Sequence, residues 1–137
     1  LAQPLPYYGY TDISADRRIR LIFRVIAYFS PGHVLILSSQ PRLLKMAVHR
    51  AYSQAIITGN AAFKPDFVIA DAMDASAADM KRFASEGTNM IVLNATRETR
   101  PELAEAMHQG MIFDNGRSTL VVIPARGLPR QDFRVKF

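Results

Sequence analysis

Val34-Leu35-Ile36-Leu37-Ser38-Ser39-Gln40 is the stretch that decides the fold of this 137-residue chain. Four consecutive apolar residues are typical of a strand buried on both faces of a parallel sheet, and here three polar residues end the run. Residues 67–70 repeat the pattern and end in Asp71, and residues 90–93 repeat it and end in Asn94. Because such strands need cover on both sides, helices are expected above and below the sheet.

The segments between these runs have the periodicity of helices. In residues 14–29 the apolar residues recur at intervals of three and four, and Ser14 is the expected N-cap. Ser39 is the expected N-cap of a helix over residues 41–51, and Ser76 and Thr99 begin capping-box spacings for two further helices. Strands that alternate with helices predict an α/β domain with three layers, α/β/α, in which right-handed crossovers join a parallel sheet.

Length and composition indicate one globular domain over residues 1–137. Residues 120–123 are expected to add a late strand, and residues 124–137, rich in Arg, Pro and Gly, are expected to be an irregular basic tail. There is no Cys, so disulfides and thiolate metal sites are excluded. No apolar stretch reaches the roughly 18 residues of a spanning helix, so we expect a soluble, intracellular protein without a membrane partner.

The net charge of +5 is unevenly distributed along the chain. Residues 1–65 carry eight Lys and Arg against two Asp, residues 66–114 carry four against nine Asp and Glu, and residues 115–137 carry five against one. Two interpretations stay open at this point. The cations form a basic face that attracts phosphate backbones or acidic partners, or they belong to an ordinary solvated surface.

Polar residues follow the predicted strands at the points where ligands bind in such sheets. Gln3 leads into a turn that ends Gly9-Tyr10-Thr11, the second turn holds Ser39 and Gln40, the third is Asp71-Ala72-Met73, and the fourth runs from Asn94 through Glu98 to Pro101. In this order and spacing, the whole chain resembles the first RecA-like domain of a superfamily-1 helicase of the nonsense-decay type. The resemblance implies a P-loop NTPase fold, with Gln3, Gly9, Tyr10, Thr11, Asp71 and Glu98 at its nucleotide-binding positions.

Departures from the family pattern remove the chemistry that the resemblance implies. The family has GPPGTGK[ST] where this chain has bulky tyrosines and no lysine, so ATP binding in the family manner is not expected. Ala72 replaces the carboxylate of the family's DEA motif that positions the attacking water. Glu98 stands in place of a phosphate-sensing Gln and would repel phosphate. We therefore expect no catalytic residues and no turnover.

Several of these residues have a second, purely structural interpretation. Asp71 is either a turn residue or a metal ligand, and the tyrosines of the first turn either stack on bases or fill the space of a nucleotide. Arg100 either faces phosphate or pairs with Glu102 or solvent. The three His residues lack the spacing of metal ligands, so no metal site is expected from them.

The sequence leaves two classes of function in competition. In the first, an inactive helicase-derived domain binds nucleic acid, RNA or DNA, or a protein partner, and its role is either in binding or in docking on a second such domain. In the second, residual Mg²⁺-dependent ATP binding or phosphohydrolysis uses Thr11, Asp71 and Asp74. The residues expected to contact nucleic acid are Ser39, Gln40, Arg42, Lys45, Arg50, Arg130 and Arg134.

Overall fold

The computed structural model describes residues 16–60 and 64–137, and the structural statements below concern these residues. The expected N-cap Ser14 and the expected nucleotide-binding residues Gln3, Gly9, Tyr10 and Thr11 lie outside them. In chain order the elements are α2 (Arg17–Phe29), β1 (His33–Leu37), α3 (Arg42–Ala51), β2 (Ile56–Thr58), β3 (Phe67–Asp71), α4 (Ala77–Ser85), β4 (Asn89–Leu93), α5 (Thr99–Ala106), β5 (Met111–Asp114), β6 (Leu120–Ile123) and β7 (Gln131–Arg134).

The strands form one seven-stranded sheet in the order β2-β1-β3-β4-β6-β5-β7. Strands β2, β1, β3 and β4 are parallel, as the apolar runs predict, but β6 is antiparallel to both β4 and β5. The expectation of a fully parallel sheet is therefore wrong at β6. Only residues 115–119 join β5 to β6, and a connection that short forms a hairpin, whereas a parallel pair needs a long crossover.

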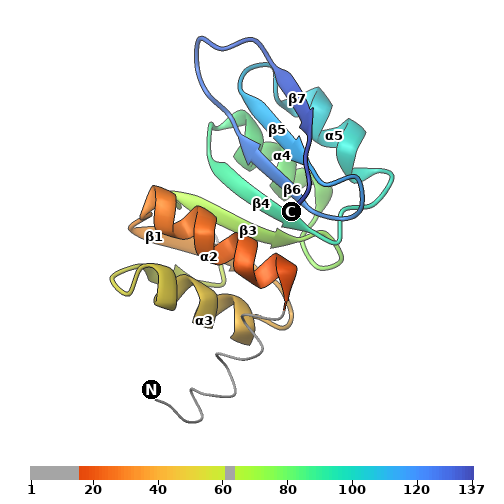
Figure 1. The fold of residues 1–137 in the computed structure, drawn as a ribbon. Helices are drawn as coiled ribbons and strands as arrows, with labels where there is room; N and C mark the ends of the chain where they lie inside the picture. The colour runs from red at the N-terminus through yellow and green to blue at the C-terminus, as the bar shows by residue number, and fades with distance from the viewer. Residues whose placement is uncertain (1–15, 61–63) are drawn as a thin grey trace.

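Helices cover the sheet on both sides, which gives the expected three layers (Figure 1). Buried residues of α2 and α3, such as Ile22, Ile26 and Val48, pack in one core cluster with Ile36 and Ile69 of the sheet. On the other face, α4 and α5 belong to a second cluster with the alternate residues of the same strands. The central strands are thus apolar except for one terminal residue each, because both of their faces are covered.

Helix caps agree with the sequence at one predicted position and differ at three. Ser76 accepts a hydrogen bond from the backbone N–H of Asp79 at 3.0 Å and caps α4, as predicted. Pro41 holds the N-cap position of α3, so Ser39 is not its cap. Thr99 lies inside α5, and its hydroxyl instead accepts a hydrogen bond from the N–H of Thr96 at 2.9 Å. The helix predicted to begin at Ser14 begins after Asp16, which accepts hydrogen bonds from two backbone N–H groups of its first turn.

Residues 124–137 contain a strand that the sequence did not predict. Strand β7 pairs in parallel with β5, and the ring of Phe133 stacks on Phe113 of β5 with ring centroids 5.3 Å apart. The rest of this segment is irregular, in agreement with its Pro and Gly content. Its return to β5 depends on Gly110, whose φ of 108° lies in a region that side chains rarely adopt.

Replacement of Gly110 by Ala should destabilise the protein by about 3 kcal/mol or more. A Cβ atom at this position would collide with the backbone of Ile123 and Ala125, in addition to the strain of the positive φ. Urea unfolding measures the change in free energy. Gly87→Ala is the matched control, because Gly87 also has a positive φ but nothing lies near its Cβ position, and it should cost only about 1 kcal/mol. Equal losses in the two variants would contradict this assignment.

Candidate functional site

The order of the strands creates a switch point between β1 and β3. From β1 the chain passes through α3 to β2 on one side, and from β2 it crosses back to β3 on the other side of β1. The helices that follow β1 and β3 belong to opposite layers, α3 to one core cluster and α4 to the other. In open α/β sheets, ligands bind at such a point, beside the carboxyl ends of the two strands.

A pocket of about 340 Å³ lies at this edge. Its polar lining comes from the turn after β1, the turn after β3 and the end of β4, and α2 begins beside it with Asp16 and Arg18. The structure therefore brings Ser39, Gln40 and Asp71 together, although they are far apart in the sequence. We call this cavity the switch-point pocket; its polar lining is Asp16, Arg18, Ser38, Ser39, Gln40, Asp71, Asp74 and Asn94.

Asp71 is fully engaged within the protein. The side-chain amide of Asn94 donates to both carboxylate oxygens at 3.0 Å, and the backbone N–H of Met73 donates at 2.9 Å. The backbone carbonyl of Asp71 accepts further hydrogen bonds from Asp74 and Ala75. These contacts join the turns that follow β3 and β4, which is the role of a turn residue. Asn94 reaches Asp71 from a left-handed backbone conformation with φ of 55°.

Asp74 ties the turn after β1 to the turn after β3. One of its carboxylate oxygens accepts from the backbone N–H of Ser39 at 2.9 Å and from the Ser39 hydroxyl at 3.1 Å. A turn between a strand and a helix N-terminus is where such folds usually hold a phosphate on backbone N–H groups. Here a carboxylate of the protein itself occupies the N–H of Ser39. An external anion would have to displace it against charge repulsion.

The described residues assemble no metal site, because they contain no cluster of three or more His, Cys, Asp or Glu side chains with suitable geometry. Two of the His residues have structural contacts instead. Nε2 of His33 lies 3.0 Å from the hydroxyl of Thr58, and Nε2 of His49 lies 3.3 Å from the carbonyl of Ala55. Neither His lines the switch-point pocket.

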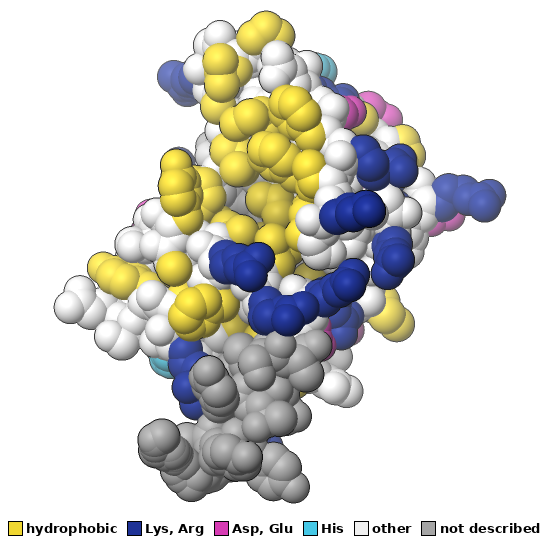
Figure 2. Space-filling model, viewed as in Figure 1, with side chains coloured by type: hydrophobic (Ala, Val, Ile, Leu, Met, Phe, Trp, Pro, Cys, Tyr) yellow, Lys and Arg dark blue, Asp and Glu magenta, His cyan; other side chains and the backbone are white. Residues whose placement is uncertain are grey.

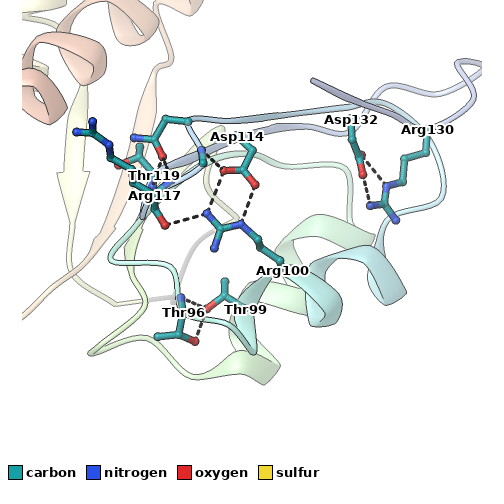
Figure 3. Close-up of polar contacts among 10 residues, drawn as sticks. Thr96, Thr99, Arg100, Asp114, Arg117, Thr119, Arg130 and Asp132 are labelled. Atoms are coloured by element: carbon teal, nitrogen blue, oxygen red, sulfur yellow. Dashed lines mark hydrogen bonds and ion pairs between the residues drawn. The ribbon is translucent and has the colours of Figure 1, made fainter. Parts of the chain in front are cut away.

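Arg100 and Glu98 do not face the switch-point pocket. Arg100 forms a two-pronged ion pair with Asp114 of β5, with Nε and Nη2 at 2.7 and 3.0 Å from the carboxylate oxygens, and also donates to the carbonyl of Arg117 (Figure 3). The expected pairing of Arg100 with phosphate, Glu102 or solvent is therefore wrong. Glu98 is exposed at the N-cap position of α5 and does not line the pocket.

The hydrogen bonds from Arg100 hold the pKa of Asp114 below its ordinary value. Partial burial works against this shift, and a hydrogen bond of 2.7 Å from the backbone N–H of Gly116 adds to it. The same pair raises the pKa of Arg100. This ion pair joins α5 to the β5–β6 hairpin and is structural.

The cations predicted to bind nucleic acid do not form one patch. Arg42, Lys45 and Arg50 lie on α3, which connects β1 to β2, whereas Arg134 lies on β7 at the opposite edge of the sheet. Arg130 is committed to an ion pair with Asp132 at 2.7 Å and to the carbonyl of Ala104 at 3.1 Å (Figure 3). The structure therefore separates the two halves of the predicted nucleic-acid site.

A different set of cations lies together on α2 and at the end of the described chain. Arg17, Arg20, Arg24 and Lys136 line a shallow pocket of about 340 Å³ with Leu21 and Phe137. In the part of the chain that the structure describes, none of these four cations has an ion pair. We call them the basic row; Lys and Arg side chains gather on this face in Figure 2. The spacing of the three arginines was visible in the sequence, but their proximity to Lys136 depends on tertiary structure.

Comparison with protein-family models, curated proteins and solved structures finds no match to this chain. Among the helices of residues 16–60 and 64–137, none is long and apolar enough to cross a membrane.

Replacement of Arg100 by Met should destabilise the protein at neutral pH by about 1 to 2 kcal/mol, because Asp114 loses its charged partner. The folded pKa of Asp114 lies below the unfolded value of about 3.9, so the ion pair contributes fully above that pH and its contribution is lost as the pH falls through the folded pKa. Urea unfolding from about pH 7 to about pH 3 should show the stabilities of wild type and variant converging in acid. Arg97→Met removes an exposed cation from the turn before α5 and should show little change. A pH-independent gap for Arg100→Met would contradict the assignment.

Replacement of Asp74 by Ala should free the N–H and hydroxyl of Ser39. We expect a loss of about 1 kcal/mol in unfolding free energy, together with a larger stabilisation by inorganic phosphate than wild type shows. Thermal melts with and without phosphate measure both effects. Glu86→Ala is the control, because it removes an exposed negative charge without opening the turn after β1. The same phosphate response in both variants would show that Asp74 does not occupy an anion position.

Proposed function

We propose that this chain is a catalytically inactive domain that works by binding, and that its partner is a protein with an acidic surface. One observation carries the proposal. In the switch-point pocket the carboxylates of Asp71 and Asp74 are paired with donors of the protein itself. The four cations of the basic row, which form no ion pair among the described residues, lie instead on the face formed by α2 and the last described residues, beside an apolar surface.

The absence of catalysis is supported by the identity and engagement of the pocket residues. The hydroxyl of Ser39 donates a hydrogen bond to the carboxylate of Asp74, and no histidine lines the pocket to act as a base for Ser39. Ala72 occupies the position at which the helicase family has the carboxylate for the attacking water. For the alternative, residual Mg²⁺-dependent binding of ATP, the carboxylates that would hold the ion already accept hydrogen bonds within the protein, Asp71 from Asn94 and Met73 and Asp74 from Ser39.

We also propose that the helicase resemblance extends from α2 to β4. The turns that the resemblance relates to nucleic-acid contact and to the DEA motif meet at one edge of the sheet, and α2 begins at that edge. The antiparallel β6 beside β4 departs from a parallel sheet, so the proposal does not include the hairpin of β5 and β6. A RecA-like ancestry of this segment would explain why a pocket lies at the carboxyl ends of β1 and β3 although Ala72 replaces the carboxylate of the DEA motif.

Nucleic acid is the second candidate partner, because Arg17, Arg20 and Arg24 follow one another on one side of α2 without ion pairs. Such a row neutralises phosphates irrespective of base sequence. The surface beside the row is apolar, however, and has almost no polar groups to meet the edges of bases. An acidic protein surface with apolar residues satisfies both features, so we favour a protein partner.

Mg²⁺-ATP should leave the melting temperature of the protein unchanged, and no phosphate release above the buffer rate should occur. A ligand at 100 times its dissociation constant would add about 2.7 kcal/mol, which a thermal melt detects easily. The purified chain should be tested together with Asp71→Asn as a matched variant. A shift in wild type that Asp71→Asn abolishes would establish the alternative function.

A labelled single-stranded oligonucleotide should bind only weakly at physiological salt, in the range of non-specific binding of about 10⁻⁴ to 10⁻⁶ M. Fluorescence anisotropy over a series of salt concentrations measures this. Tight binding that Arg17→Ala, Arg20→Ala and Arg24→Ala together abolish would identify nucleic acid as the partner and overturn the choice of protein. Arg42→Ala with Lys45→Ala on α3 is the control for loss of charge alone.

A further inference from the structure

One part of a sheet face has no covering helix among the described residues (Figure 1). On the side of α2 and α3, the described helices lie in front of β1 and β3, and none lies in front of β5 and β6 (Figure 1). At this place an apolar groove of about 290 Å³ runs between α2 and the last described residues. It is lined by Leu21, Val25, Phe29, Phe113, Ile123 and Phe137. Figure 2 shows it as a hydrophobic hollow with Lys and Arg side chains along its border.

The groove is an open edge of the hydrophobic core. Phe113, Ile123 and Phe137 are only partly buried, yet they pack against the same cluster that contains Ile22 and Val121. A side chain that enters the groove would therefore complete the packing of residues that are already half covered. The volume is about twice the roughly 150 Å³ that holds a benzene ring, which is room for two large apolar side chains.

We propose that this groove binds an amphipathic helix of a partner protein, with its apolar residues against the sheet and acidic residues against Arg20, Arg24 and Lys136. This inference rests on the proposed function and names the partner element. A helix satisfies its own backbone hydrogen bonds, as it must, because the face of a sheet offers no backbone donors or acceptors. A bound strand would need a free sheet edge, whereas the sheet residues of the groove come from β5 and β6, which are paired on both sides.

Charge selects this occupant over a second copy of the chain. Arg24 and Phe137 line both the groove and the basic row, so any occupant of the groove lies beside four cations without ion pairs. Two copies in contact at this face would bring two basic rows together in a protein of net charge +5. Acidic residues on either side of an apolar helix face match the row, as electrostatic complementarity requires.

The test uses labelled helical peptides of about 18 residues and the full chain. The first peptide has Leu at i, i+3 and i+7 with Glu on both flanks, and the second has Lys in place of every Glu. We expect the acidic peptide to bind with a dissociation constant on the order of 1 to 100 μM by fluorescence anisotropy, and the basic peptide not to bind. The double variant Arg20→Glu with Arg24→Glu should bind the acidic peptide at least about tenfold more weakly than wild type. The same variant should bind the basic peptide, which wild type does not.

A second variant tests the groove itself. Phe137→Ala should weaken the acidic peptide by about tenfold, whereas Ile56→Ala removes an exposed apolar side chain at the far edge of the sheet and should have no effect. Circular dichroism melts confirm that each variant is folded.

The outcomes separate this inference from the proposed function. No binding of the acidic peptide to the folded chain, or binding that neither variant changes, would overturn the helix proposal while the tests with ATP and oligonucleotide still stand. Self-association of the chain through this face in sedimentation, abolished by Phe137→Ala, would replace the partner helix by a second copy. Tight oligonucleotide binding that the arginine variant abolishes would overturn both the helix proposal and the choice of a protein partner.

Discussion

The burial of three short apolar strands on both of their faces is the constraint on which the rest of the structure depends. Strands β1, β3 and β4 have fully buried centres, represented by Val34, Val68 and Ile91. Full burial of one such side chain stabilises the fold by about 1.5 to 3 kcal/mol, so a one-sided sheet would forfeit much of the core. Cover on both sides requires the helix after β1 and the helix after β3 to lie in opposite layers. That requirement places the switch point between β1 and β3 and directs the turns after them to a common edge.

At that edge, hydrogen bonds among the polar residues join the turns that follow the strands. Carboxylates that bind a metal or activate water need open coordination positions or a perturbed environment. Asp71 already accepts three hydrogen bonds, from Asn94 and Met73, and one oxygen of Asp74 accepts two from Ser39. The pocket is a product of the topology, and its residues close the ends of the strands. The order of the strands alone therefore accounts for a cavity at this place.

The sequence predicts the buried part of the fold well and its periphery poorly. The runs that form β1, β3, β4 and β6 are continuous and apolar, and the helical periodicity of α2 and α3 is strong. Strands β2 and β5 are short and only partly buried, and the four residues of β7 are exposed. Their pairing partners are distant or antiparallel, so no local pattern indicates these strands. Ser39 and Arg100 have partners 35 and 14 residues away, Asp74 and Asp114, which neither capping rules nor local charge pairing can predict. The strand order explains where the switch-point pocket lies. The basic row depends on the tertiary contact between α2 and the last described residues.

The two outer strands also determine how this sheet behaves toward other sheets. An unpaired strand edge is a template for unwanted growth, and proteins commonly blunt it with charge or brevity. Strand β7 carries Asp132 and Arg134 on four exposed residues, and β2 has only three residues despite its exposed Ile56. Neither β2 nor β7 is the long, flat, apolar edge strand that favours fibril formation. The apolar groove on the face of the sheet therefore stays exposed without a sheet edge that favours aggregation by strand pairing.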